Sequence, residues 1–149
     1  MLKLGKSLIV LLLASMLSAC ATAPGQKFTG VVTPASDQCD IYLYRASSIS
    51  MVGRAFDVSL DGKPVGKLFN ASYLQMRVPA GQHKLTVIPG GVGKNSDIQV
   101  EAKPGQTMFF QYNFITGLLT NIFFAGSNIE PRDQERALQD LKELTAANK

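Results

Sequence analysis

Side chains able to carry covalent or acid–base chemistry are few in this sequence of 149 residues, which holds two cysteines and one histidine. His83 would need an oriented nucleophile beside it to act as a general base, and the sequence shows neither a Gly-x-Ser-x-Gly motif nor a Cys–His arrangement. Asp57 and Asp61 could share a strand face like paired glycosidase carboxylates, but Asp61 falls in a predicted turn and the pair should be solvated. We therefore expect no enzyme activity. We also expect no cofactor and no metal site, since no second histidine or cysteine stands at ligand spacing.

Cys20 is the residue whose surroundings indicate a specific reaction. Lys3 and Lys6 precede an apolar run, Ser7 to Leu17, that is shorter than the roughly 20 residues of a membrane-spanning helix. The run ends in Leu17-Ser18-Ala19-Cys20, which resembles the bacterial lipobox of a branched apolar residue, two small residues and a cysteine. The resemblance implies that the thiol becomes a diacylglyceryl thioether and that a peptidase removes the signal peptide, residues 1–19. An ordinary secretory signal with a coincidental cysteine is the alternative.

Acylation of Cys20 would anchor the chain, because two or more acyl chains hold a protein stably on a bilayer. Ala21 follows the cysteine, where an aspartate would retain the protein at the inner membrane under enterobacterial-type sorting. We therefore expect a lipid anchor on the periplasmic side of the outer membrane. The 15 basic and 11 acidic side chains form no basic cluster, and Lys3 and Lys6 leave with the signal, so we expect no nucleic-acid partner.

Two further features resemble reactive sites and are interpreted as structural. The segment from Gly90 to Asn95 resembles a phosphate-binding loop, but Ile88 stands where the leading glycine is required and no helix is predicted to follow. A hairpin loop is the better interpretation. Cys39 has no intramolecular disulfide partner once Cys20 is acylated. It is predicted to be a small buried residue at the start of a strand, with an intermolecular disulfide as the alternative.

The chain after the signal changes character at Cys39. Residues 20–38 carry Pro24, Gly25, Gly30 and Pro34 without a sustained period, which predicts a lipidated flexible tether. Short alternating runs then predict strands at residues 41–45, 55–60, 63–68, 73–78, 83–89, 98–102, 107–114 and 121–125.

Turn and edge signals support this assignment. Asp61-Gly62 predicts a two-residue hairpin, and Pro64 predicts an edge strand. Residues 131–145 place Ala137, Leu141 and other apolar residues at helical spacing. The expected fold of residues 39–145 is mainly β: a small antiparallel β-sandwich, prealbumin-like or immunoglobulin-like, with one C-terminal amphipathic helix.

Several motifs together resemble a known family. They are Tyr42-Leu43-Tyr44-Arg45, the run from Val58 to Gly66, Asn70-Ala71-Ser72-Tyr73, the run from Val78 to His83, and Lys103-Pro104-Gly105-Gln106-Thr107. This pattern resembles a bacterial lipoprotein domain family of unknown function, number 2846, and is similar to the PEGA-type β-sandwich modules of envelope proteins. The resemblance implies an envelope location and a non-catalytic fold, and it brings no established activity.

Aromatic residues near the end of the predicted sheet are the candidate interaction surface. Phe109-Phe110 and Phe123-Phe124 are adjacent pairs, so in strands one member of each pair must point away from the sandwich interior. Either the terminal helix covers that member, or it is exposed as a contact for a protein or a membrane. We expect a non-catalytic, lipid-anchored module that binds an envelope protein or has a structural role. Binding of a small envelope ligand, a glycan or lipid fragment, is the alternative.

Overall fold

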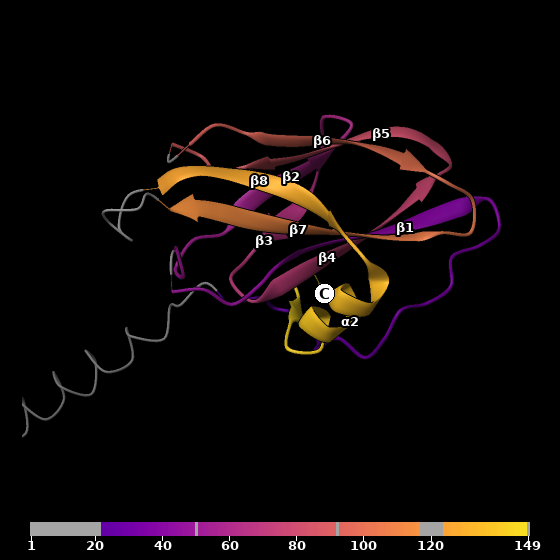
Figure 1. The fold of residues 1–149 in the computed structure, drawn as a ribbon, viewed down its shortest axis with the longest axis horizontal. Helices are drawn as coiled ribbons and strands as arrows, with labels where there is room; N and C mark the ends of the chain where they lie inside the picture. The colour runs from indigo at the N-terminus through magenta and orange to yellow at the C-terminus, as the bar shows by residue number, and fades with distance from the viewer. Residues whose placement is uncertain (1–21, 50, 92, 117–123, 149) are drawn as a thin grey trace, which may run out of the picture.

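The computed structural model describes residues 22–49, 51–91, 93–116 and 124–148. These residues form two β-sheets packed face to face, with one short helix against the outer face of the larger sheet (Figure 1). The mainly β fold with a single helix near the C-terminus confirms the prediction. The elements are β1 Gln38–Arg45, β2 Phe56–Leu60, β3 Lys63–Leu68, β4 Ser72–Pro79, β5 Gly81–Ile88, β6 Ser96–Ala102, β7 Thr107–Thr116, β8 Phe124–Arg132, α2 Gln134–Leu141 and β9 Thr145–Ala146.

The larger sheet has the strand order β8-β7-β1-β4-β9, and the smaller sheet has the order β3-β2-β5-β6. Most neighbours are antiparallel, but β1 pairs in parallel with β7, and β4 pairs in parallel with β9. The prediction of an antiparallel sandwich did not include these two parallel pairings. Asp61 and Gly62 both have positive φ, as a two-residue hairpin between β2 and β3 requires, and Pro64 lies on the edge strand β3.

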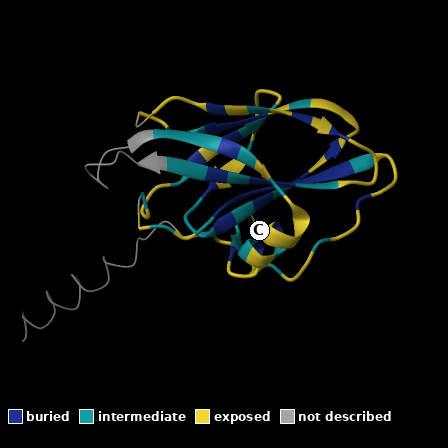
Figure 2. Ribbon diagram, viewed as in Figure 1, coloured by how far each residue is buried: buried dark blue, intermediate teal, exposed yellow. Residues whose placement is uncertain are grey.

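Strand β1 lies in the middle of the larger sheet and is buried on both faces. Cys39, Ile41 and Leu43 point into the space between the sheets and join the main core. Tyr42 and Tyr44 point to the outer face, where they form a second apolar cluster with the helix. Figure 2 shows this arrangement as buried strand centres with exposed residues along the helix and the loops.

The helix is shorter than predicted, because Asp133 caps its start. The Asp133 carboxylate accepts a hydrogen bond from the backbone N–H of Arg136 at 2.9 Å, so the helix begins at Gln134. Ala137 and Leu141 face the second cluster. Leu144 joins that cluster from the turn after the helix. The predicted helix over 131–145 is therefore wrong at both ends.

The strand predicted at 121–125 is also displaced, since β8 runs from Phe124 to Arg132 and pairs along β7. Residues 121–123 lie outside the described part of the chain. Strand β8 is an edge strand, which explains how it includes Pro131 without breaking the sheet. The described residues include no helix that is both long enough and apolar enough to cross a bilayer.

Candidate functional site

Residues 25–28, named here the N-terminal segment, are paired to the C-terminal strand. Lys27 bridges antiparallel to Thr145, Phe28 N–H donates to Leu144 O at 3.1 Å, and Ala146 N–H donates to Gln26 O at 2.8 Å. In Figure 1 the indigo N-terminal chain accordingly passes behind α2 before it turns into β1. The prediction of a flexible tether over residues 20–38 is wrong for residues 25–28, because these hydrogen bonds hold the segment against β9.

Gly25 allows the N-terminal segment to approach residues 146–148 closely. Its N–H donates to Ala146 O at 3.0 Å. A Cβ atom at this position would lie 2.3 Å from Asn148 O and 2.6 Å from Ala146 O, which is too close for any side chain. Only glycine therefore fits at position 25, a restriction that would not apply in a flexible linker.

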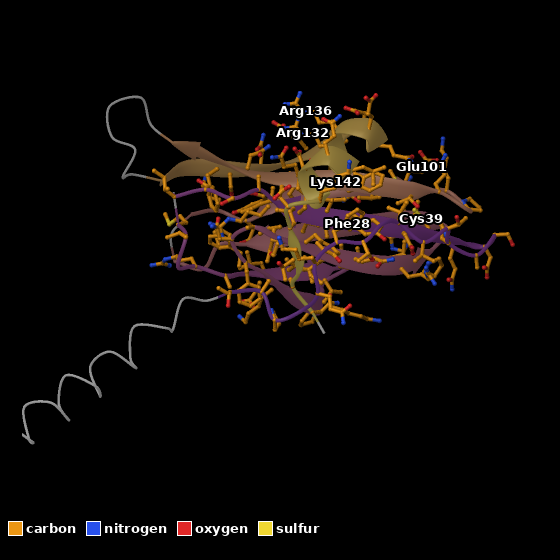
Figure 3. The ribbon with its side chains drawn as sticks, turned by 90° about the horizontal axis from the view of Figure 1, so that it is seen from below. Phe28, Cys39, Glu101, Arg132, Arg136 and Lys142 are labelled. Carbon is orange, nitrogen blue, oxygen red and sulfur yellow. The ribbon has the colours of Figure 1, made fainter. Side chains whose placement is uncertain are left out.

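Phe28 secures the N-terminal segment to the outer face of the larger sheet (Figure 3). Its ring contacts Tyr73 edge-on with 5.5 Å between centroids, and Tyr42 edge-on at 6.1 Å. Tyr42 in turn stacks on Phe109 at 5.5 Å. Such aromatic pairs contribute about 0.5–1.5 kcal/mol each beyond burial. The chain continues over this face, where Pro34 is also buried.

A groove of about 580 Å³ lies along the seam between the N-terminal segment, β4 and β9. Amide groups dominate its polar lining, since Gln26, Gln75 and Asn148 come from three separate parts of the chain. Tyr73 supplies an aromatic surface, and Lys27 supplies one positive charge. The remaining lining residues are Pro24, Gly25, Thr29 and Ala146.

A buried carboxylate fixes Gln75 in this groove. Asp40 on β1 is fully buried and accepts hydrogen bonds from Gln75 Nε2 at 3.0 Å and from Arg77 Nε and Nη2 at 2.7 and 2.9 Å. The hydrogen bonds from Arg77 lower the pKa of Asp40 below its usual value, against the opposing effect of burial. Asp40 is therefore a paired anion that orients its neighbours, and not a free acid.

The aromatic pair Phe109-Phe110 is not the exposed surface that was predicted as one alternative. Phe110 is 2% exposed and lies in the core between the sheets, whereas Phe109 is 3% exposed and lies in the cluster under the helix. The two rings do point to opposite faces, and α2 covers the outer one. Phe123 lies outside the described residues. Phe124 begins β8, and its side chain also lies outside the described part.

The other residues singled out by the sequence lie away from the groove. His83 Nδ1 contacts Asp61 Oδ2 at 2.7 Å, and its Nε2 contacts Pro79 O at 2.9 Å. The hydrogen bond to Asp61 raises the pKa of His83, because both ring nitrogens then donate to acceptors. Asp57 forms an ion pair with Lys67. These carboxylates therefore occupy surface ion pairs and do not face one another across a cleft.

Cys39 and the glycine loop match their structural interpretations. Cys39 is completely buried, which raises the pKa of its thiol and removes it from contact with another chain. Residues 89–95 connect β5 to β6, so a strand and not a helix follows Lys94. In the described residues no group of three or more acidic, histidine or cysteine side chains is arranged to hold a metal ion. Cys20 lies outside the described part.

The groove was missed in the sequence because three distant segments form it. Residues 24–29 were interpreted as tether, and residues 146–148 follow the predicted helix. The one local signal was Gly25 in a stretch that also carries Phe28, an apolar residue that a solvated linker does not need.

Comparison with known proteins identifies a family for most of the chain. A family model described as protein of unknown function (DUF2846) matches residues 35–127. No curated protein and no solved structure matches the chain. The matched region covers β1 to β7 and the start of β8, so the N-terminal segment and β9, which form one side of the groove, lie outside it.

Proposed function

The chain belongs to the DUF2846 family, whose description assigns no activity, and we propose that it is a non-catalytic, lipid-anchored binding module. The groove and the motif that ends at Cys20 support this proposal. The module would be held through Cys20 on the periplasmic side of the outer membrane. Its groove would bind an extended segment of an envelope protein.

The lining of the groove carries this proposal. Side-chain amides donate and accept hydrogen bonds at once, as the backbone of an extended peptide requires, and Gln26, Gln75 and Asn148 offer three of them. Tyr73 adds an apolar body with a polar tip, a combination that is enriched at protein interfaces. Asp40 holds Gln75 in place, which reduces the entropy lost when a ligand orders that side chain.

The ionisable groups around the groove support binding rather than catalysis. Its lining contains Lys27 and Tyr73 as titratable side chains. Burial raises the pKa of Tyr73, so its hydroxyl stays protonated at neutral pH. The nearby carboxylate of Asp40 is occupied by Arg77 and Gln75. A general base would need a free carboxylate or imidazole in reach of the ligand.

The lipobox-like motif supports the location. Among the described residues, Gly25 is the first that is hydrogen-bonded to β9, and it follows Cys20 by five residues, which span at most about 18 Å when fully extended. The groove would therefore lie close to the bilayer, where it meets other membrane-attached proteins.

A small envelope ligand is the second candidate for the same groove. A volume of about 580 Å³ falls within the range of pockets that hold small molecules, roughly 300–1,000 Å³. An aromatic ring beside several amides also suits the face and hydroxyl groups of a sugar.

Site-specific photocrosslinking in living cells tests the protein-binding proposal. A photoreactive amino acid replaces Gln75 or Asn148 in the full chain, and the matched control replaces Gln99, an exposed glutamine on β6 of the other sheet. We expect a discrete adduct of defined mass from the groove positions and none from position 99. The same adduct from all three positions would contradict the groove as the binding site.

Mass spectrometry and membrane fractionation test the anchor separately. The wild-type chain should carry acyl groups at its mature N-terminus and sediment with the outer membrane, whereas Cys20→Ser should do neither. An unmodified wild-type chain in the soluble periplasm would refute the anchor.

The photocrosslinking experiment also separates the two candidate ligands. Protein adducts would favour an extended peptide in the groove, and loss of crosslinking on adding envelope glycan fragments would favour the small ligand.

A further inference from the structure

The topology places four strand connections at one end of the sandwich. Residues 46–55, 69–71, 89–95 and 117–123 join β1 to β2, β3 to β4, β5 to β6 and β7 to β8. The pairings of Arg45 with Ser72, of Phe56 with Leu68 and of Asp57 with Ile88 show that these strands begin or end together. We name this the loop end. The fourth connection, 117–123, lies outside the described residues and is not part of the surface considered below.

The 46–55 connection exposes apolar side chains at the loop end. Ile49 is 93% exposed and Val52 is 56% exposed, and with Val32 they are the large hydrophobic residues most exposed in the described part of the chain. Single exposed apolar residues are common on protein surfaces. Two exposed aliphatic side chains in one loop indicate a contact surface only if the loop has a fixed conformation.

Arg45 holds the tip in place from inside the fold. Arg45 is 1% exposed. Its guanidinium carbon lies 5.1 Å from the Phe56 ring centroid and 4.8 Å from that of Phe114, and its N–H groups donate to Met51 O and Arg54 O at 2.8 Å each. Burial lowers the pKa of Arg45 to about 10, so the side chain is still charged at neutral pH. Burying a cation costs free energy. The buried guanidinium of Arg45 binds the carbonyl groups of Met51 and Arg54 and so fixes the loop.

Two further contacts fix the same loop. The backbone N–H of Ser48 donates to Asn70 Oδ1 at 3.1 Å, and Arg54 N–H donates to Met51 O at 3.0 Å in a turn where Met51 has φ of 57°. The described residues of the loop on both sides of position 50 are therefore held by hydrogen bonds, and Ile49 and Val52 are exposed there.

The charge of the loop end suits a phospholipid surface. The three connections 46–55, 69–71 and 89–95 contain Arg54 and Lys94 and no aspartate or glutamate. At the opposite end the connections contain Asp61 as well as Lys103, and Asp37 precedes β1 there. The exposed carboxylates of Asp57 and Asp97 at the starts of β2 and β6 are paired with Lys67 and Lys84. Aliphatic residues beside basic residues are typical of surfaces that enter the headgroup region of a bilayer.

The N-terminal segment meets the sheet at this same end. Strand β9 pairs with Ser72 and Tyr73 at the start of β4, and Thr145 N–H donates to Ala71 O at 3.2 Å. Gly25 binds Ala146, the next residue, and Asn70 binds the 46–55 loop. A chain of hydrogen bonds thus connects the loop to the N-terminal segment.

We propose that the 46–55 loop is a second membrane contact, through which Ile49 and Val52 enter the headgroup region of the bilayer that holds the lipid on Cys20. This inference rests on the proposed lipid anchor. It adds an orientation: the loop end faces the bilayer and the hairpin between β2 and β3 faces away.

Depth-dependent quenching tests the orientation on the full, lipidated chain. The protein is reconstituted into vesicles of phosphatidylethanolamine and phosphatidylglycerol that carry a nitroxide on the lipid acyl chain. A fluorophore is attached to Ile49→Cys or, as the matched control at the opposite end, to Lys103→Cys. The buried Cys39 should react little, and the unsubstituted protein measures that background. We expect severalfold stronger quenching and a blue shift at position 49.

A charge at the tip provides the second variant. Adding Val52→Asp to the protein labelled at position 49 should reduce quenching severalfold, while the chain stays on the vesicles through its lipid. Equal, weak quenching at positions 49 and 103 in vesicle-bound protein would overturn the orientation and leave the anchor intact. Protein that does not float with vesicles, like Cys20→Ser, would overturn the anchor and the orientation together.

Discussion

Tyr44 on β1 donates its phenolic O–H to Asp140 Oδ2 of α2 across 2.8 Å. Burial is the main reason that the pKa of Tyr44 is raised, and the hydrogen bond to Asp140 adds to it. This contact ties the middle of the larger sheet to the helix that covers its outer aromatic cluster. It lets the second cluster include a tyrosine hydroxyl without leaving that polar group buried and unsatisfied.

Removing this hydroxyl should weaken the docking of the helix. We expect Tyr44→Phe to lower the free energy of unfolding by about 1 kcal/mol, the usual contribution of one hydrogen bond. Urea denaturation followed by circular dichroism measures the change. A double-mutant cycle with Asp140→Ala should show that the two effects are not additive, and full additivity would mean that the contact contributes nothing.

A side chain at position 25 should detach the N-terminal segment. Gly25→Ala places a Cβ within 2.3 Å of Asn148 O, so the pairing of residues 25–28 with β9 must shift or open. We expect amide hydrogen exchange at Phe28 and Ala146 to speed up at least tenfold, about 1.4 kcal/mol in opening free energy. Gly53→Ala is the matched control, because a Cβ there meets nothing within 4 Å. Unchanged exchange in Gly25→Ala would contradict the tight approach.

The Asp40–Arg77 pair should make the fold sensitive to acid. The pKa of Asp40 is lowered in the folded protein, so its stabilising contribution is complete above about pH 4, its unfolded pKa, and is lost as the pH falls through the folded value. Arg77→Met should lower the free energy of unfolding at neutral pH, because it leaves the buried carboxylate of Asp40 without its charged partner. It should also flatten the acid limb of a plot of urea midpoint against pH. Arg136→Met, an exposed arginine on α2, should leave that limb unchanged.

The single histidine gives a pH response of opposite sign. Because the pKa of His83 is raised, its contribution to stability is complete below the unfolded value near 6.5 and is lost as the pH rises through the folded value. An NMR titration of the His83 ring should show a midpoint above 6.5, and Asp61→Asn should move the midpoint back down. A midpoint unaffected by Asp61→Asn would show that the pair is not formed in solution.

Local patterns in the sequence were sufficient for most of the strands. Alternation from Tyr73 to Val78 and the Asp61-Gly62 turn are properties of short segments, and the structure keeps both. Strand β8 was misplaced because Ile129 is its one residue classed as buried among those whose side chains are described. Its strand character comes from pairing with β7, and such pairing leaves little trace in an edge strand. The terminal helix was overextended because Leu144 fits the helical period but packs from the following turn.

Contacts between distant parts of the chain could not be predicted from local sequence patterns. Nothing near Lys27 indicates that Thr145 will lie beside it, and the groove depends on that pairing. The burial of Phe109 likewise required knowing that α2 lies over β1 and β7. The sequence did predict that the two adjacent rings point to opposite faces of the strand, with the outer ring either covered by the helix or exposed. In the structure the helix covers it.

The pairing of the N-terminal segment with β9 also has a consequence for the order of events during biogenesis. These contacts join residues 25–28 to residues 144–146, so they form only after β9 has been made, and such long-range contacts are slow to form. If the chain is exported from its N-terminus and acylated at Cys20, as we propose, the lipid would be attached before β9 reaches the periplasm. The pairing with β9 would then follow acylation and bring the folded domain closer to the bilayer.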